Sequence, residues 1–459
     1  MAKPSIPQGT RDFGPVVVQK RQYIFHHIRS VFELYGFQPL ETPAMENLET
    51  LMGKYGEEGD KLIFKILNNG LSQPEKHEQA RAGFEKLLEG KNTKELTERA
   101  LKYDLTIPFA RYVAMNHGQI NFPFRRYQMQ PVWRADRPQK GRYREFYQCD
   151  ADIVGSRSLL NELELVNLYH DVFTRLGIKD YDLRINSRKI LAALAEQCGS
   201  AERMMDITIA IDKLDKIGME KVQEELRQKG LDEEKISLIR RYLEIEGNNE
   251  QKLLAISQLL GDNQLAKKGL DELSFIVNHH AADTSQAVNL SIDFTLARGL
   301  NYYTGIIFEV KAPANIKMGS IGGGGRYDDL TGLFGVPNIP GVGISFGVDR
   351  IYDVMEELNL FPEELSEGAR VLFFNLGESE SQAAFSLLQQ LRRKGIAAEI
   401  YHENAKFDRQ FKYAEKKKIP FITIIGSKEL ELKTCTVKDL RSGEQKNIAF
   451  ENLPDFLFI

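Results

Sequence analysis

The sequence predicts an α+β protein, in which a strand-rich N-terminal part carries a helical insertion and is followed by a smaller α/β domain. Three observations support this prediction. Two strand-like segments, YQMQPVWRAD and REFYQCDADIVG, flank a short loop that contains Pro138 and Gly141. Residues about 187–287 have helical patterns almost throughout, and from residue 368 onward strand and helix patterns alternate.

The N-terminal elements follow from apolar spacing and from proline. The segment QKRQYIFHHIRSVFELYGF has apolar residues at helical spacing, from Tyr23 to Leu34, and Gly36 is expected to end this helix. The next segment, FQPLETPAMEN, is predicted to be extended, because Pro39 and Pro43 disfavour a helix. Residues about 71–99 are polar and helix-prone, so we expect them to form a surface excursion. The sequence does not indicate what this excursion does.

Asp104 and Thr106 lie in LKYDLTIPFARY, at a predicted junction between a strand and a helix. One interpretation is structural, with a side chain of this pair capping the helix that begins near Ile107. The other is functional, with the carboxylate anchoring an amino group of a ligand. The residues alone leave both interpretations open.

The predicted hairpin has a strongly basic tip. Although the chain has a formal net charge of −4, twenty residues contain seven basic side chains, Arg125, Arg126, Arg134, Arg137, Lys140, Arg142 and Arg144, and the carboxylates Asp150 and Asp152 follow. A charged tip is ordinarily a solvated loop, but here arginines alternate with aromatic residues, which indicates pleated strands with defined faces. Because a guanidinium group grips phosphate oxygens in pairs, the hairpin predicts a phosphate ligand, with a nucleic acid at its tip as a second possibility.

Strand patterns return in LSIDFTLA and YTGIIFEVKA, and the pair Tyr302 and Tyr303 lies where the second strand is predicted to begin. Two adjacent tyrosines in a strand are expected to divide between core and surface, unless one of them faces a pocket and offers its hydroxyl. The four glycines at 322–325 let the backbone approach a ligand or another strand closely. They are not a P-loop, because no GK[ST] follows.

Arg350 lies in the first turn of a helix that is predicted from VGISFGVDRIYDVMEEL. The helix dipole disfavours a cation at that end, so Arg350 is expected to have an anionic partner. A salt bridge and a ligand phosphate are equally good candidates for that partner.

Composition limits the class of protein. The 459 residues are 42% hydrophobic and 27% charged, as in soluble globular proteins, and allow two to four domains. No apolar run approaches the roughly 18 residues that span a bilayer, and the N-terminus lacks the apolar core of a signal peptide. The three cysteines and the paired histidines have neither disulfide nor metal-ligand spacing. We therefore expect a cytoplasmic protein without membrane contact or a protein-bound metal, which meets a polyanion over a limited surface.

Taken together in this order, the segments resemble a known family. The first helix with FQPLETPAMEN, then VWRADRP…RYREFYQCDADIVG, then GVGISFGVDR, resemble the three motifs of class II aminoacyl-tRNA synthetases. LARGLNYYTG and GGGGRYDDL resemble two signatures of the histidyl-tRNA synthetases within that class. The N-terminal QGTRDFGP and the C-terminal α/β pattern also fit, so the resemblance covers nearly the whole chain. Each motif alone is weak, whereas the ordered set is specific.

The resemblance implies a fold and a division into domains. Residues 1–186 and 288–365 would form the two parts of a catalytic domain, an antiparallel sheet flanked by helices. Residues 187–287 would be a helical insertion, and 368–459 an α/β anticodon-binding domain. The segment around Pro43 would form a homodimer interface. The aromatic and lysine residues of QFKYAEKKK suit contact with RNA.

The resemblance also implies an activity. The family activates L-histidine with ATP, giving histidyl-adenylate and pyrophosphate, and then transfers histidyl to the 3′ end of tRNA(His). ATP is a substrate and Mg²⁺ is expected to accompany it. The first step is an in-line attack at phosphorus, which requires positioning and fixed positive charge. Histidine brings an ammonium group and an imidazole N–H, so its pocket must supply acceptors.

Matching positions give the implied site residues. Catalytic roles fall to Arg134, Arg298 and Arg350. Histidine binding falls to Asp104, Leu105, Thr106, Arg134, Gln148, Asp152, Arg298, Tyr302, Tyr303 and Tyr327. ATP binding falls to Arg134, Arg144, Phe146, Arg298 and Arg350, and contact with the tRNA acceptor end to Arg137, Gln139, Lys140 and Arg142.

Two other classes of function compete with this interpretation. One is a synthetase-like regulatory paralogue of the kind that supports histidine biosynthesis, although such proteins usually lack the RGL.YY signature and the C-terminal domain, both of which are present here. The other is an RNA-binding module without charging activity. One departure is Asn301, which stands where the family usually has aspartate. Bacterial and eukaryotic features are mixed, so the source organism stays open.

Overall fold

The computed structural model describes residues 3–199, 201–280, 289–297, 302–366 and 368–458. The chain divides into two compact units, Met1–Phe361 and Pro362–Ile459, and each is described by itself. Within the described residues, no helix is both long and apolar enough to cross a membrane.

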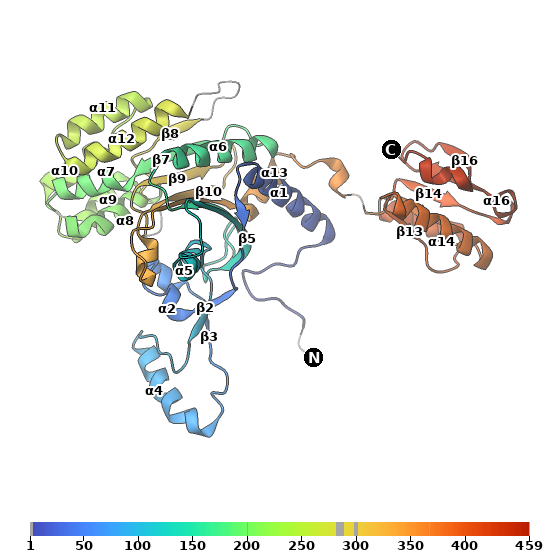
Figure 1. Cartoon of the computed structure of the whole chain (residues 1–459), viewed down its shortest axis with the longest axis horizontal. Coiled ribbons are helices and arrows are strands. Elements are labelled where there is room, and N and C mark those ends of the chain that lie inside the picture. Colours follow the sequence, from blue (N-terminus) through green and yellow to red (C-terminus); the bar gives the residue numbers. More distant parts are fainter. Residues whose placement is uncertain (1–2, 200, 281–288, 298–301, 367, 459) are drawn as a thin grey trace. The chain divides into compact units, whose positions relative to one another are not determined.

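An eight-stranded sheet forms the centre of the first unit (Figure 1). Its order is β1-β5-β6-β11-β10-β9-β7-β8, from β1 (Gln38–Pro39), β5 (Phe124–Trp133), β6 (Glu145–Val154), β7 (Asp182–Ser187), β8 (Leu290–Ile292), β9 (Ile306–Lys311), β10 (Gly322–Tyr327) and β11 (Gly341–Gly347). The outer pairs β1–β5 and β7–β8 are parallel, and the pairs between them are antiparallel. The expected antiparallel sheet is confirmed, with the predicted hairpin as its pair β5–β6.

Alternation along β6 gives the sheet two different faces. Cys149, Ala151 and Ile153 are fully buried in the main apolar core, which they share with the helices α1 (Pro15–Leu34), α6 (Leu160–Arg175) and α13 (Val348–Glu357). Because successive side chains of a strand point to opposite faces, Gln148, Asp150 and Asp152 point the other way, toward α5 (Thr106–Asn116). The polar face of the sheet is therefore the face available for a site.

Helix α1 follows the predicted pattern and ends before Gly36, whose φ is +76°. Its inward residues are buried at Ile24, Ile28 and Val31, whereas Leu34, which was expected on the apolar face, is 66% exposed. The predicted extended segment after it supplies β1 and β2.

The glycine run forms β10, in the middle of the sheet. A Cβ on Gly324 would lie 2.2 Å from the carbonyl oxygen of Gly343 on β11, and one on Gly325 would lie 2.8 Å from the ring of Tyr303. Glycine is required here because neighbouring groups come closer than any side chain allows. The predicted close approach to another strand is confirmed at Gly324, and Gly323 also lines a cavity.

In sequence, a small second sheet and the predicted excursion of residues 71–99 lie between α1 and α5. The sheet has the order β2-β4-β3, from β2 (Met45–Asn47), β3 (Lys65–Ile66) and β4 (Arg99–Leu101), with the short helices α2 (Leu48–Leu51) and α3 (Gly56–Lys61) beside it. Between β3 and β4 the chain forms η1 (Pro74–Lys76) and α4 (His77–Leu88), in which only Gly83 is buried. The predicted surface excursion is confirmed.

The helical block lies between the neighbouring strands β7 and β8. It consists of α7 (Arg188–Gln197), η2 (Ala201–Arg203), α8 (Met204–Asp212), α9 (Leu214–Gln228), α10 (Glu233–Leu243), α11 (Asn249–Leu260) and α12 (Gln264–His279). The predicted strand LSIDFTLA is shorter than expected, because only 290–292 pair with β7 and a turn follows. The 3-10 turn η3 (Leu330–Phe334) connects β10 to β11.

The second unit is a five-stranded sheet of order β13-β12-β14-β15-β16. Its elements are η4 (Glu363–Ser366), β12 (Val371–Phe373), α14 (Glu378–Arg393), β13 (Ala398–Ile400), α15 (Phe407–Lys416), β14 (Phe421–Ile424), α16 (Ser427–Leu432), β15 (Thr434–Asp439), β16 (Gln445–Ala449) and η5 (Phe450–Asp455). The three strands β13, β12 and β14 are parallel, as the alternating pattern predicts. The antiparallel hairpin β15–β16 was not predicted.

Candidate active site

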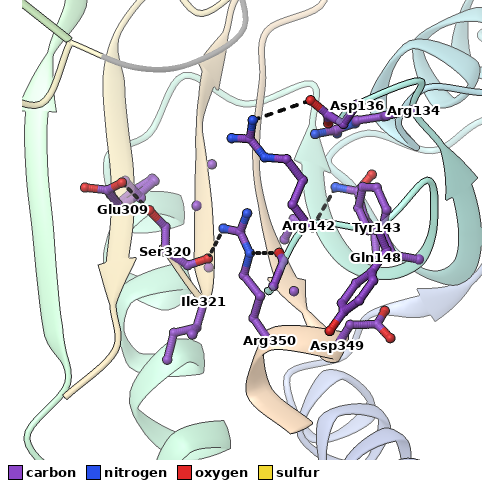
Figure 2. A pocket seen from close by; sticks show the side chains of 18 of the residues that line it. Arg134, Asp136, Arg142, Tyr143, Gln148, Glu309, Ser320, Ile321, Asp349 and Arg350 are labelled. Atoms are coloured by element: carbon purple, nitrogen blue, oxygen red, sulfur yellow. Dashed lines mark hydrogen bonds and ion pairs between the residues drawn. The ribbon is translucent and has the colours of Figure 1, made fainter. Parts of the chain in front are cut away.

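A cavity of about 370 Å³ opens on the polar face of the central sheet. The residues around it come from β6, β9, β10 and β11, from the β5–β6 loop and from the start of α13: Arg134, Asp136, Gly141, Arg142, Tyr143, Phe146, Gln148, Leu296, Tyr303, Phe308, Glu309, Ser320, Ile321, Gly322, Gly323, Gly324, Ser345, Gly347, Asp349 and Arg350. Figure 2 shows three arginines, Arg134, Arg142 and Arg350, around this space. The basic hairpin and the arginine of α13, which are far apart in sequence, therefore meet at one cavity.

Arg134 is held in place before any ligand arrives. Its Nε donates to the carbonyl oxygen of Tyr103 at 3.0 Å, and its guanidinium group lies 4.3 Å from the ring centroid of Tyr103 and 5.2 Å from that of Phe146. It makes no ion pair with any described residue. A fixed guanidinium group without a carboxylate partner at a cavity wall suits an anionic ligand.

Arg350 is oriented by two backbone carbonyls. Its Nε donates to Gly141 at 2.7 Å and its Nη1 to Ser320 at 2.6 Å (Figure 2). Arg142 lies 3.5 Å from Asp136 and lines the same cavity. Thus the β5–β6 loop and the first turn of α13 support each other and direct two cations toward one volume.

The N-terminal segment braces this arrangement. Asp349 accepts hydrogen bonds from Arg11, from Arg21 at 2.6 Å and from the backbone N–H of Tyr147 at 3.1 Å. The Arg11 guanidinium also lies 3.3 Å from the ring centroid of Tyr143, in the loop. The motif QGTRDFGP therefore has a structural use, which is to connect the β5–β6 loop to α13.

A smaller cavity of about 40 Å³ lies beside the larger one. It is lined by Asp104, Thr106, Gln148, Asp150, Asp152, Tyr302, Tyr303, Gly323, Tyr327, Gly343, Ile344 and Ser345. Gln148, Tyr303, Gly323 and Ser345 line both cavities. Asp104, Asp150 and Asp152 form the acidic wall of this cavity. A side chain at position 343 would collide with it, since a Cβ on Gly343 would lie 2.0 Å from Asp152 Oδ1.

Asp104 caps the first turn of α5 and also lines the smaller cavity. Its Oδ1 accepts from the backbone N–H of Ile107 at 3.2 Å, in the first turn of α5, and from the hydroxyl of Tyr55 at 2.8 Å. Its Oδ2 accepts from Tyr302 at 2.9 Å, inside the smaller cavity. Burial raises the pKa of Asp104, and the hydrogen bonds oppose that shift.

Asp152 is paired with a buried arginine that sequence analysis did not assign to the site. Arg126 Nη2 lies 2.9 Å from Asp152 Oδ2, and both side chains are almost completely buried. Arg126 is further held against the ring of Phe109, 4.2 Å from its centroid. Burial raises the pKa of Asp152, while Arg126 and the hydroxyl of Tyr327 oppose the rise.

Three acceptor oxygens in the smaller cavity are buried without a hydrogen-bond donor among the described residues. They are Gln148 Oε1, Asp150 Oδ1 and Asp152 Oδ2, the last of which has only its ion pair with Arg126. A buried acceptor without a donor costs free energy, so the cavity is suited to a ligand that supplies N–H groups. Asp150, like Arg126, was not among the site residues predicted from the sequence.

Tyr302 and Tyr303 both face this cavity. Of the two alternatives for this pair, the structure has the one in which a tyrosine faces a pocket, because β9 begins only at Ile306 and strand alternation does not apply to these residues. Their rings meet edge to face, with centroids 4.9 Å apart.

The remaining predicted site residues lie elsewhere. Leu105 and Arg144 line neither cavity; Leu105 accepts from Arg126, and Arg144 Nε donates to the carbonyl of Asp136. Arg137, Gln139 and Lys140 lie in the exposed β5–β6 loop, where Lys140 pairs with Glu357. Arg298 and Asn301 lie outside the described residues.

Comparison with known proteins follows the same division of the chain. Residues 77–351 match the family model of histidyl-tRNA synthetase, and residues 370–458 match that of an anticodon binding domain. The histidine–tRNA ligases of Christiangramia forsetii and Bacteroides fragilis are each 52% identical to the chain, over 98% of both sequences. A crystal structure of histidyl-tRNA synthetase from a Nostoc species covers 99% of both chains, with a TM-score of 0.79 and 31% identity.

The antiparallel sheet, the arginine-lined cavity on its polar face and the C-terminal α/β unit define a class II aminoacyl-tRNA synthetase. Beside this cavity, the smaller one adds three carboxylates and three tyrosines, which are groups suited to an amino-acid substrate. The chain belongs to the histidyl-tRNA synthetase family.

Proposed function

We propose that the chain is a histidine–tRNA ligase, which activates L-histidine with ATP and then transfers histidyl to the 3′ end of tRNA(His). The observation that carries the proposal is a pair of cavities that share lining residues, one lined by arginines and one by buried acceptors. The arginines of the first suit the phosphates of ATP, and the acceptors of the second suit the N–H groups of an amino acid. Histidine-dependent exchange of pyrophosphate into ATP, followed by charging of tRNA(His), tests both steps; a chain that performs neither would overturn the proposal.

The geometry supports specific roles. Arg134 holds the α-phosphate and the substrate carboxylate, and Arg350 holds the far end of the triphosphate, with Phe146 beside the base. Asp104, Thr106 and Gln148 receive the ammonium group, and Asp152 with Tyr303 receives the imidazole. Arg298 keeps its assignment to the α-phosphate from sequence resemblance alone. Since Arg142 lines the larger cavity, we assign it to ATP as well as to tRNA.

Mg²⁺ would enter with ATP. Among the described residues, no group of three or more His, Cys, Asp or Glu side chains is arranged to hold a metal ion. The ion would therefore be held mainly by phosphate oxygens, with Glu309 and Asp136 as the carboxylates at the cavity wall that can complete its shell. When bound, it neutralises charge on the phosphates.

The relatives favour the ligase over the regulatory paralogue, since the curated proteins at about half identity carry the ligase name over their full length. An RNA-binding module would have no use for a cavity of buried acceptors. We further propose a homodimer that contacts through the segment around Pro43. We propose the cytoplasm as its compartment, since a chain that charges tRNA for translation meets its substrates there.

Replacing Arg137 by Ala should weaken tRNA charging and leave amino-acid activation unchanged. Arg137 is exposed in the β5–β6 loop, so its charge is available to a phosphate of the acceptor end. We expect a several-fold rise in the KM for tRNA(His) and a salt dependence of tRNA binding that is weaker by about one counterion. Arg81→Ala, which removes an exposed arginine from α4, is the control. An equal effect of both variants would show that the loop has no special contact.

A chain that ends at Phe361 should still activate histidine but should not charge tRNA efficiently. The first unit contains both cavities, and the second unit has apolar cores of its own. We expect pyrophosphate exchange within about threefold of the full chain and tRNA charging reduced by two or more powers of ten, about 3 kcal/mol. Loss of exchange in a folded truncated chain would contradict the assignment of activation to the first unit.

A further inference from the structure

Asp150 is a buried acidic residue that the roles above do not use. It lies on β6 between Gln148 and Asp152, is 3% exposed, and lines the smaller cavity. Its Oδ1 has no hydrogen-bond donor in the part of the chain that the structure describes. Since side chains two apart on a strand share a face, Gln148, Asp150 and Asp152 form one row of acceptors. The roles proposed above use only Gln148 and Asp152 of this row and leave Asp150 without a ligand contact.

The charges around Asp150 leave the cavity rich in carboxylates. Several charged or titratable groups interact electrostatically with it: Arg126 on β5, Asp152 on β6, Asp104 before α5, Lys102 after β4, Tyr169 on α6 and Tyr303 before β9, and the hydroxyl of Ser345 on β11 donates a hydrogen bond to it. Arg126 already pairs with Asp152. Burial, together with the charges of Asp152 and Asp104, raises the pKa of Asp150 to about 7, while Arg126 and Ser345 oppose the rise.

We propose that Asp150 is a further histidine-recognition residue. It binds the imidazole ring of the substrate beside Asp152, and in the bound state one proton lies between the Asp150 carboxylate and the ring nitrogen that faces it. The inference rests on the proposed function. A neutral imidazole has one N–H and one bare nitrogen. In this arrangement the N–H donates to Asp152, and the bare nitrogen faces Asp150, two residues before it on the same face of β6. The bare imidazole nitrogen and the ionised Asp150 carboxylate are both acceptors, so a hydrogen bond between them requires an added proton.

The proton balance follows from this geometry. Above pH 7 the free ring is neutral and Asp150 is ionised, so binding takes up one proton from the solvent. Near pH 6 either the imidazole ring of free histidine or Asp150 already carries that proton, so binding takes up less from the solvent. Histidine affinity should therefore fall as pH rises above 7, by up to about tenfold between pH 7 and pH 8.

The test is calorimetric titration of the full-length protein with L-histidine at pH 8, in two buffers of different ionisation enthalpy. The wild-type chain should take up about one proton per histidine. Asp150→Asn keeps the shape and supplies an N–H that does not titrate, so its proton uptake should vanish and its affinity should change less than about twofold between pH 7 and pH 8. Asp171→Asn removes a carboxylate on α6 that bonds Tyr35, outside both cavities, and should behave as wild type.

Three outcomes would overturn the inference. Wild-type binding without proton uptake would show that the ring is held as a neutral group, and this measurement does not depend on any variant. Unchanged uptake in Asp150→Asn would place the proton on another carboxylate. Equal loss of ATP and histidine affinity in Asp150→Asn would make the residue structural. If the wild-type chain binds no histidine, the proposed function itself fails.

Discussion

Replacing Arg134 by Ala is expected to lower the rate of histidyl-adenylate formation by about a thousandfold, or roughly 4 kcal/mol. Negative charge grows on the α-phosphate as the carboxylate attacks, and a guanidinium group that is already oriented stabilises that charge without reorganising. Arg134 meets this condition, because Tyr103 accepts its Nε–H and the rings of Tyr103 and Phe146 hold its plane. The loss should therefore appear mainly in the rate constant and less in the KM for ATP or histidine.

The measurement is single-turnover formation of adenylate, beside transfer from preformed adenylate to tRNA. Arg134→Lys should recover only part of the rate, because a point charge does not reproduce the planar fork. Arg137→Ala, in the exposed part of the same loop, should leave adenylate formation unchanged and affect transfer alone. If Arg134→Ala raises only the KM, or slows both steps equally, Arg134 is a binding or folding residue.

The extent to which the sequence predicted this site depends on how local each signal is. The β5–β6 hairpin follows from alternating patterns, and alternation also places Gln148 and Asp152 on one face. The same rule separates Arg125 from Arg126, yet sequence analysis counted both among the basic residues near phosphate. Arg126 is instead fully buried and paired with Asp152, whereas Arg125 pairs with Glu164 near the surface. The polar residues Arg126, Gln128 and Gln130 at every second position of β5 were the signal that could have found the inner face.

Other parts of the site depend on contacts between distant segments. Nothing in the local sequence of Arg11 predicts its contact with Asp349, which is 338 residues away. The expectation of an anionic partner for Arg350 rested on the helix dipole alone, and no local pattern predicts that the carbonyl oxygens of Gly141 and Ser320 accept from its guanidinium group. Local sequence left the orientation of Tyr302 and Tyr303 open, because the beginning of β9 depends on pairing with β7 and β10. Register across a sheet is a property of the fold, and local propensity does not determine it.

Replacing Arg126 by Met is expected to destabilise the first unit by about 3–5 kcal/mol at pH 8. The side chain is fully buried and is the ion-pair partner of Asp152, and it lowers the pKa of both Asp150 and Asp152. Methionine fills much of the volume but leaves these carboxylates without their cation. Their pKa values in the folded state then rise further above the unfolded values, so the folded chain gains protons as pH falls. The deficit should therefore be largest at pH 8 and should shrink toward pH 5.

Urea unfolding followed by tryptophan fluorescence measures this effect in the correct unit, because Trp133, the only tryptophan, lies on β5 with Arg126. Arg125→Met is the matched control: its pair with Glu164 at 2.6 Å is 29% and 38% exposed, and its loss should cost less than about 1 kcal/mol. Combining Arg126→Met with Asp152→Asn should recover much of the stability, since the second change removes the uncompensated charge. Equal deficits for the two arginine variants, or a deficit that does not shrink at low pH, would show that Arg126 acts through packing and not through charge. In that case the positive charge of Arg126 would not be what keeps Asp152 ionised, and the proposed hydrogen bond from the imidazole N–H to an Asp152 carboxylate would lose its basis.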